Sequence, residues 1–280
     1  MNTDLRTSSM AALRQIEQIQ DSHDTGRGSE IHLRSDSEGS CAYKAVALKS
    51  ASSFGRIASF FSRSEFQKKA NQFTIAQVKE DIKNAFGDEV AGAFESKFFL
   101  RKFFGSPLTK GALMTFLEEK KLTLNSEAEV PLKPEINTPS SLLSNRKNAA
   151  ACYGNAAQAQ KEGAWKEARA WERAATHYES ATNLEKEGEA TKTEPYITEG
   201  ASFKKAGQLF QKAVIARKAD DTLTADSYTA QAKQTYHEAD VAVQTRRGSP
   251  KKADRSMTEA RKAQNDALRS VRLARFKVDK

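Results

Sequence analysis

Alanine and aromatic residues form the apolar face of the segment 164–182, and this feature constrains the fold more than any other. Ala168, Trp171, Ala175 and Tyr178 recur at steps of three and four residues, which places them on one narrow stripe of a helix. Small residues let two helix axes approach closely, and an aromatic ring about every second turn fills the space opposite. The stripe therefore predicts a seam between packed helices and not the wall of a ligand pocket.

Similar alanine stripes recur in three other segments of the C-terminal half, at residues 149–163, 203–213 and 232–243. Their spacing predicts long helices over 165–187, 197–218 and 222–244, folded back on one another as antiparallel hairpins. We therefore expect an alanine/aromatic helical-hairpin domain over residues 146–245.

The stretch "ACYGNAAQAQKEGAWKEARAWERAATHYE" resembles one tetratricopeptide helical hairpin. Ala156, Gly163, Ala168 and Ala175 lie at that family's spacing of small residues, and Trp165 matches the aromatic residue after the turn glycine. The resemblance covers about one repeat and implies antiparallel helices packed through alanine.

Phenylalanine dominates a separate region, since twelve of the fifteen phenylalanines lie between Phe54 and Phe116. We expect a small Phe-rich helical bundle over residues 41–124. Thr74 is the predicted N-cap and Gly87 the predicted C-terminal glycine of one helix. A second helix is expected to begin at the acidic residues 88–89, and Thr109 is expected to cap a third.

Proline and polar residues separate the two regions, because three of the six prolines lie in residues 125–145. We interpret 125–145 as a linker. Residues 1–40 are rich in Ser, Thr, Gly and charge. We expect them to be mostly disordered, as a candidate secretion signal, with one short helical stretch around Met10, Leu13 and Ile16. The whole chain is expected to be all-α, with almost no strand.

Positive charge concentrates at the C-terminal end. Residues 246–280 hold twelve Lys and Arg against four Asp and Glu, a net charge of +8 out of +9 for the chain. This basic amphipathic tail is expected to contain a helix from Ser256 onward, which either binds an anionic partner or docks on the alanine-rich helices. The candidates for an anionic partner are Arg246, Arg247, Lys251, Lys252, Arg269, Arg272 and Arg275.

The stretch "SKFFLRKFFGSPL" at 96–108 interleaves aromatic rings with cations. Adjacent phenylalanines cannot all face inward on one helix, so some of these rings are expected to meet lipid while the cations meet headgroups. The alternative is that the rings are core and the cations solvated. The membrane-binding candidates are Lys97, Phe98, Phe99, Arg101, Lys102, Phe103 and Phe104.

Signals for catalysis are sparse. Cys41 is the one candidate nucleophile, expected at a helix N-terminus, and it leaves a cysteine-dependent enzyme as an alternative. The four histidines have no partner at i+4 and the sequence holds no CxxC, GxGxxG or phosphate-binding loop. We therefore expect no metal and no cofactor, and we favour binding over catalysis.

The stretch "VKEDIKNAFGDEVAGAF…FGSPLTKGAL" resembles a helical module found in N-terminal regions of bacterial type III secreted effectors. Its marks are Phe86-Gly87, Val90-Ala91, Ala93-Phe94 and the stretch 105–109. The resemblance implies a virulence-related effector or adaptor, secreted without a Sec signal, that acts in a host cell.

The partners we expect are host or bacterial proteins, an acidic membrane surface and a secretion chaperone. Nucleic acid is less favoured, because no aromatic residues interleave with the cations of the tail. The alternative hypothesis is a scaffold, secretion regulator or chaperone of the bacterial cytoplasm.

Overall fold

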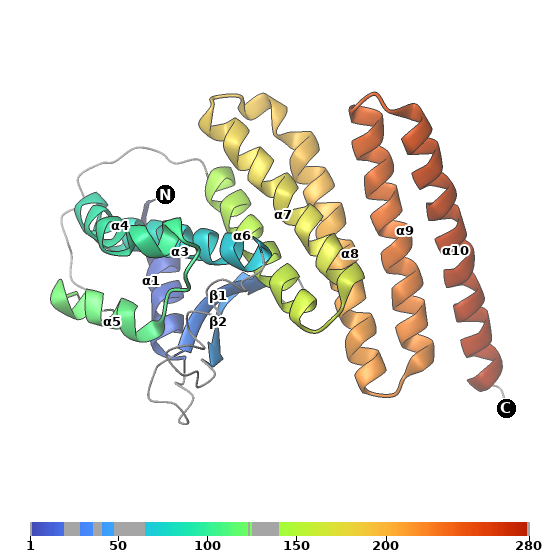
Figure 1. Cartoon of the computed structure of the whole chain (residues 1–280), viewed down its shortest axis with the longest axis horizontal. Coiled ribbons are helices and arrows are strands. Elements are labelled where there is room, and N and C mark those ends of the chain that lie inside the picture. The colour runs from blue at the N-terminus through green and yellow to red at the C-terminus, as the bar shows by residue number, and fades with distance from the viewer. Residues whose placement is uncertain are drawn as a thin grey trace. The chain divides into compact units, whose positions relative to one another are not determined.

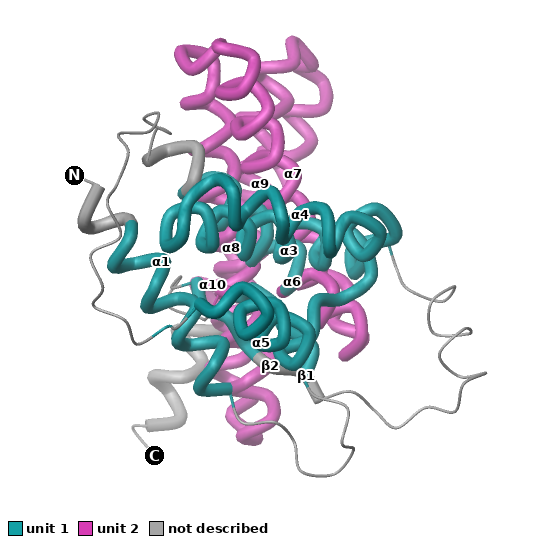
Figure 2. Tube along the Cα trace, turned by 90° about the vertical axis from the view of Figure 1, so that its left-hand side faces the viewer, with its two compact units in different colours: residues 1–34, 41–154 teal, residues 35–40, 155–280 magenta. Residues whose placement is uncertain are grey.

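A computed structural model describes residues 2–19, 29–35, 41–47, 65–122, 124 and 140–278. Within these residues the chain is mostly helical with two short strands, which confirms the all-α class (Figure 1). It divides into two compact units (Figure 2). Unit 1 comprises residues 1–34 and 41–154, and unit 2 comprises residues 35–40 and 155–280.

Unit 1 consists of a strand pair and the helices around one apolar core. Its elements are α1 (Asn2–Glu17), β1 (Ser29–Ser35), β2 (Cys41–Ala47), α3 (Glu65–Phe86), α4 (Asp88–Phe103), α5 (Lys110–Glu119) and the first part of α6 (Ser140–Lys161). The core includes residues from all of these elements. At its centre, Phe94 and Phe98 of α4 pack against Phe116 of α5 with ring centroids 5.4 and 6.1 Å from it. The predicted Phe-rich core is therefore present.

Local sequence signals set the ends of the unit 1 helices in most cases. Helix α3 ends at Phe86, as predicted, and the following Gly87 has a φ of 94°, which favours glycine. The Thr109 side chain accepts a hydrogen bond from the Ala112 N–H at 3.3 Å, so its predicted role as N-cap of α5 is confirmed. The prediction for Thr74 is wrong, because α3 begins nine residues earlier, at Glu65.

Two strands occupy residues that the sequence predicted as disordered or helical. Strands β1 and β2 pair as one sheet, and a connection of only five residues between them requires antiparallel pairing. The Ile31 N–H donates to the Leu108 carbonyl at 2.8 Å, and the Leu33 N–H donates to the Thr74 hydroxyl at 3.4 Å. These partners are distant in sequence, so short-range periodicity did not reveal the strands. Helix α1 contains the short helical stretch expected around Met10, Leu13 and Ile16, but it is longer and extends over Asn2–Glu17.

Unit 2 is a row of long antiparallel helices. They are α7 (Trp165–Lys186), α8 (Glu194–Lys218), α9 (Thr222–Arg246) and α10 (Pro250–Val278), with a short 3-10 helix, η1 (Ala190–Lys192), before α8. Helix α8 packs on α7, α9 on α8, and α10 on α9, and Figure 1 shows the four side by side. The predicted hairpins are therefore confirmed to within a few residues at each end.

The alanine stripes form the contact between these helices. Trp171 of α7 is fully buried, and a Cβ atom built on Gly207 of α8 would lie 2.7 Å from its ring. Ala168, Ala175 and Ala206 are also buried. The close seam predicted from small residues is therefore present between α7 and α8.

The segment boundaries differ from the sequence expectation in three places. The two units divide within α6, after residue 154, and not in the predicted linker, because Ala150 and Ala151 pack in the core of unit 1. Helix α6 begins at Ser140, inside the predicted linker 125–145, and residues 125–139 lie outside the described part of the chain. Helix α10 begins at Pro250 and not at Ser256. Ser256 is buried within the helix, where its hydroxyl donates to Asp240 of α9 at 2.5 Å. The Ser256 hydroxyl, which the sequence predicted to cap the start of the helix, therefore bonds to a neighbouring helix instead.

Candidate functional site

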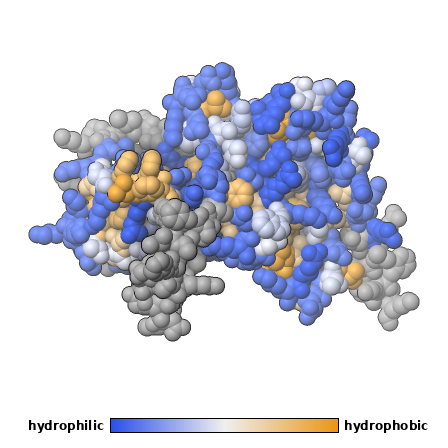
Figure 3. All heavy atoms as spheres, viewed as in Figure 1, coloured by the Kyte–Doolittle hydropathy of each residue, from blue (hydrophilic) through white to orange (hydrophobic). Residues whose placement is uncertain are grey.

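Four large apolar side chains are exposed together at the C-terminal end of α4. The exposed fractions are 56% for Phe99, 65% for Leu100, 66% for Phe103 and 48% for Phe104. Phe99 and Phe103 stack with their ring centroids 6.2 Å apart, and Phe104 meets Phe103 edge-on at 5.1 Å. We call these four residues the apolar tip. Orange, apolar atoms gather on the part of unit 1 that contains α3 and α4 in Figure 3.

The helical period explains which residues belong to the tip. Ser96 and Gly92 are exposed residues one and two turns before Leu100 on α4, so the same outward face changes from small to large apolar residues. Phe98 points the opposite way and is 3% exposed in the core, so it is not part of the tip. Leu100 was absent from the sequence candidates, although the spacing Gly92, Ser96, Leu100 and Phe103 would have identified it.

The turn after α4 holds the tip in a defined position. Gly105 has a φ of 62°, and a Cβ built on it would lie 2.7 Å from Lys68 of α3. The Asn71 side-chain amide donates to the Gly105 carbonyl at 2.8 Å, and the Arg101 guanidinium donates to the Pro107 carbonyl at 3.0 Å. The apolar tip is therefore a structured turn that is tied to α3.

The three candidate cations near the tip have partners within unit 1. Lys97 pairs with Glu119, and Lys102 lies 3.4 Å from Glu95. The hydrogen bond from Lys79 lowers the pKa of Glu95 below its ordinary value. Ion pairs this exposed contribute about 0.2–1 kcal/mol, so the lysines remain able to exchange these partners for lipid phosphates.

The candidate cations of the C-terminal tail fall into two groups. Arg246 is exposed but paired within unit 2. Its guanidinium donates to both carboxylate oxygens of buried Glu199, at 2.8 and 2.7 Å, and covers the Tyr196 ring at 4.1 Å. The other tail candidates with described side chains are exposed: Arg247, Lys251, Lys252 and Arg269. Arg272 and Arg275 lie in α10, but their side chains are outside the described part of the chain.

Cys41 is the first residue of strand β2 and does not begin a helix. The expected helix-dipole stabilisation of a thiolate is therefore absent. Its Sγ lies 3.8 Å from the Asn148 side-chain oxygen, which accepts a hydrogen bond but is not a base that removes the thiol proton. His177 and His237 belong to unit 2, whereas Cys41 belongs to unit 1. This arrangement gives no support to the alternative of a Cys41 nucleophile.

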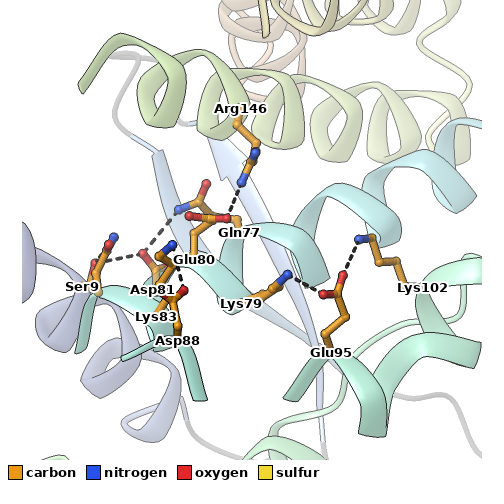
Figure 4. A network of polar contacts seen from close by, with 11 residues as sticks. Ser9, Gln77, Lys79, Glu80, Asp81, Lys83, Asp88, Glu95, Lys102 and Arg146 are labelled. Atoms are coloured by element: carbon orange, nitrogen blue, oxygen red, sulfur yellow. Dashed lines mark hydrogen bonds and ion pairs between the residues drawn. The ribbon is translucent and has the colours of Figure 1, made fainter. Parts of the chain in front are cut away.

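A buried carboxyl group at Asp81 of α3 connects three elements of unit 1. It accepts hydrogen bonds from Tyr43 of β2 at 2.6 Å, and from Ser9 of α1 and Gln77 of α3 at 3.3 Å each. Figure 4 shows Ser9 and Gln77 directed at Asp81, with the ion pair between Arg146 and Glu80 nearby. Burial raises the pKa of Asp81 to about 6, although the three hydrogen bonds act to lower it.

Replacing Asp81 by asparagine should change how stability depends on pH. Because the folded-state pKa of Asp81 is raised, the wild-type protein should lose stability as the pH rises from about 4 through about 6. The Asp81→Asn variant lacks this titration, so its stability relative to wild type should rise by about 2–3 kcal/mol across that window. Urea unfolding at pH 4, 5, 6 and 7 measures the difference, with Glu89→Gln at an exposed position of α4 as the control. A constant difference between Asp81→Asn and wild type would contradict the prediction.

Among the described residues, no three His, Cys, Asp or Glu side chains gather in a way that would hold a metal ion. Within that same part of the chain, no helix has the length and apolarity needed to cross a bilayer. Comparison of the chain with protein-family models, with curated protein sequences and with solved structures gives no match.

Proposed function

We propose that this protein is an exported effector or adaptor that acts by binding, and that the apolar tip of α4 is its contact with an acidic membrane surface. The observation that carries the proposal is the exposure of Phe99, Leu100, Phe103 and Phe104 together at the C-terminal end of α4. Soluble domains seldom expose contiguous groups of large apolar side chains without a binding role. Lys97, Arg101 and Lys102 are on the same helix, where cations suit an acidic headgroup layer.

The export part of the proposal rests on the resemblance of residues 78–113 to a type III effector module and on the Ser- and Thr-rich first 40 residues. A translocation reporter fused to residues 1–60 tests it, and a reporter signal that is independent of the secretion machinery would overturn it.

A cytosolic scaffold is the second candidate function. It is favoured by the long helical hairpins of unit 2, since stacked helices present extended surfaces to protein partners.

Liposome binding should depend on the tip at every salt concentration. Replacing Phe103 and Phe104 together by alanine removes two rings, and we expect binding to vesicles rich in phosphatidylserine to fall by about 10- to 100-fold. The matched control is Ile215→Ala with Met257→Ala, which removes two exposed apolar side chains of unit 2. Vesicle co-sedimentation measures the affinity. Equal losses in the two double variants would contradict a specific role of the tip.

The exposed tail cations should govern how binding varies with salt. Helix α10 packs on α9, so neutralising substitutions are a safer test than deletion of residues 246–280. We expect weaker binding to acidic vesicles at low salt for the triple variant Lys251→Gln, Lys252→Gln and Arg269→Gln. Each removed cation that lies near the membrane surface should cost about 1 kcal/mol of binding free energy. At high salt it should match wild type. If the full-length protein does not bind acidic vesicles at low salt, a protein partner becomes the better explanation of the exposed tip.

A further inference from the structure

A pocket of about 270 Å³ lies entirely within unit 2 and is independent of the tip in unit 1. Residues of α7, α9 and α10 line it, and Phe210 of α8 completes the lining. The alanine stripes that predicted a seam do not account for this pocket, whose other lining residues are mainly charged and aromatic. Its volume is enough for a small molecule of one ring and a few polar groups.

One part of the pocket is aromatic and preformed. Phe210 is 8% exposed, and Tyr236 is held by contacts outside the pocket. The Tyr236 ring meets Phe203 edge-on at 5.2 Å, and its hydroxyl accepts a long hydrogen bond from Arg173 at 3.5 Å. His237 packs edge-on against the same ring at 5.6 Å. The aromatic part of the lining is therefore fixed by the protein's own contacts before any ligand arrives.

The rest of the lining carries excess positive charge. Its cations are Lys166, Arg169, Lys233 and Lys262, and its carboxylates are Glu259 and Asp266. Burial is the main cause of a lowered pKa at His237, so this ring is not counted among the cations. Four cations against two carboxylates leave a net charge of +2.

The four pocket cations are not neutralised by the protein in the way that other cations of unit 2 are. Among the residues that the structure describes, none of the four forms an ion pair or a side-chain hydrogen bond. By contrast, Arg173 pairs with Asp240 at 2.8 Å and Arg246 pairs with Glu199 at 2.7 Å. The lysine and arginine side chains around the pocket therefore have unused donors.

We propose that this pocket binds a small organic phosphate that carries a flat ring. A phosphate dianion matches the net charge of +2, whereas a single carboxylate would leave half of it uncompensated. The Arg169 guanidinium suits two phosphate oxygens at once, and the lysines supply point charges. The ring of the ligand lies against Phe210 and Tyr236, where stacking favours a flat apolar group.

Isothermal titration calorimetry of the full chain with phenyl phosphate tests the proposal. We expect a dissociation constant of about 1 mM or tighter, which is ordinary for so small a ligand. Inorganic phosphate, which lacks the ring, and inositol monophosphate, whose ring is neither flat nor apolar, should each bind at least about tenfold more weakly. Equal affinity for the three ligands would overturn the role of the aromatic lining. Absence of phenyl phosphate binding would overturn the whole proposal.

A pair of matched variants separates the pocket from the general basic charge of the chain. Arg169→Gln with Lys233→Gln should weaken phenyl phosphate binding at least about tenfold, since two of four ligand-facing charges are lost. Lys205→Gln with Arg261→Gln makes the same charge change at exposed positions of α8 and α10 outside the pocket, and should leave the affinity within about twofold. Thermal melting confirms that both variants fold. Equal weakening in both would show attraction to overall charge and overturn the site.

Discussion

Replacing Trp171 by alanine should lower the free energy of unfolding of unit 2 by about 3–5 kcal/mol. Trp171 is fully buried in the seam between α7 and α8, and its ring fills the space left by Gly207. Its indole N–H also donates to Glu167 at 3.3 Å. Truncation removes the apolar contacts and leaves a cavity that two rigid helices close only in part.

The second tryptophan of the chain provides the control. Trp165 is on the same helix but is 65% exposed, so Trp165→Ala should change stability by less than about 0.5 kcal/mol. Urea unfolding followed by circular dichroism at the helical band measures both variants. Similar losses in the two would show that Trp171 does not occupy a close-packed seam.

Replacing Arg246 by alanine should cost about 3 kcal/mol, because it leaves the Glu199 carboxylate buried without its main partner. Glu199 is 4% exposed, and its other near neighbour is His177, whose Nδ1 is 3.1 Å away. Burial lowers the pKa of His177 to about 4, so this imidazole is neutral at pH 7 and does not compensate the carboxylate.

Arg247 is the matched control for this prediction. It is the adjacent residue with the same charge, and it is exposed, so Arg247→Ala should cost less than about 0.5 kcal/mol. The double variant Glu199→Leu with Arg246→Met should recover most of the loss, since apolar residues replace both members of the pair. Thermal and urea unfolding at pH 7 decide the outcome. If Arg247→Ala lost as much stability as Arg246→Ala, the assigned role of the ion pair between Arg246 and Glu199 would be wrong.

The candidate site was accessible to sequence reasoning only in part. The sequence indicated that the stretch 96–108 exposes aromatic rings, because adjacent phenylalanines cannot share one face of a helix. It could not assign that Phe98 faces the core whereas Phe99, Phe103 and Phe104 are exposed. That choice depends on Phe94 and Phe116, which pack against Phe98 and leave Phe99 outside. The pocket of unit 2 had no sequence signal, since its cations come from three separate helices.

The sequence by itself determined the presence of the long helices of unit 2 and their close seam, but not the start of α10. A helix is closed by hydrogen bonds four residues apart, and its packing stripe repeats every three or four residues. The information is therefore local. The same locality explains why the Thr109 cap and the Gly87 turn were predicted correctly.

Only the tertiary structure decided the strands of unit 1 and the role of each charged side chain. Ile31 needs the carbonyl of Leu108, and Arg246 needs Glu199 47 positions earlier in the chain. A strand has no internal hydrogen bonds, and a buried charge is stable only beside an opposite one. Both depend on partners that the fold brings together from distant parts of the chain.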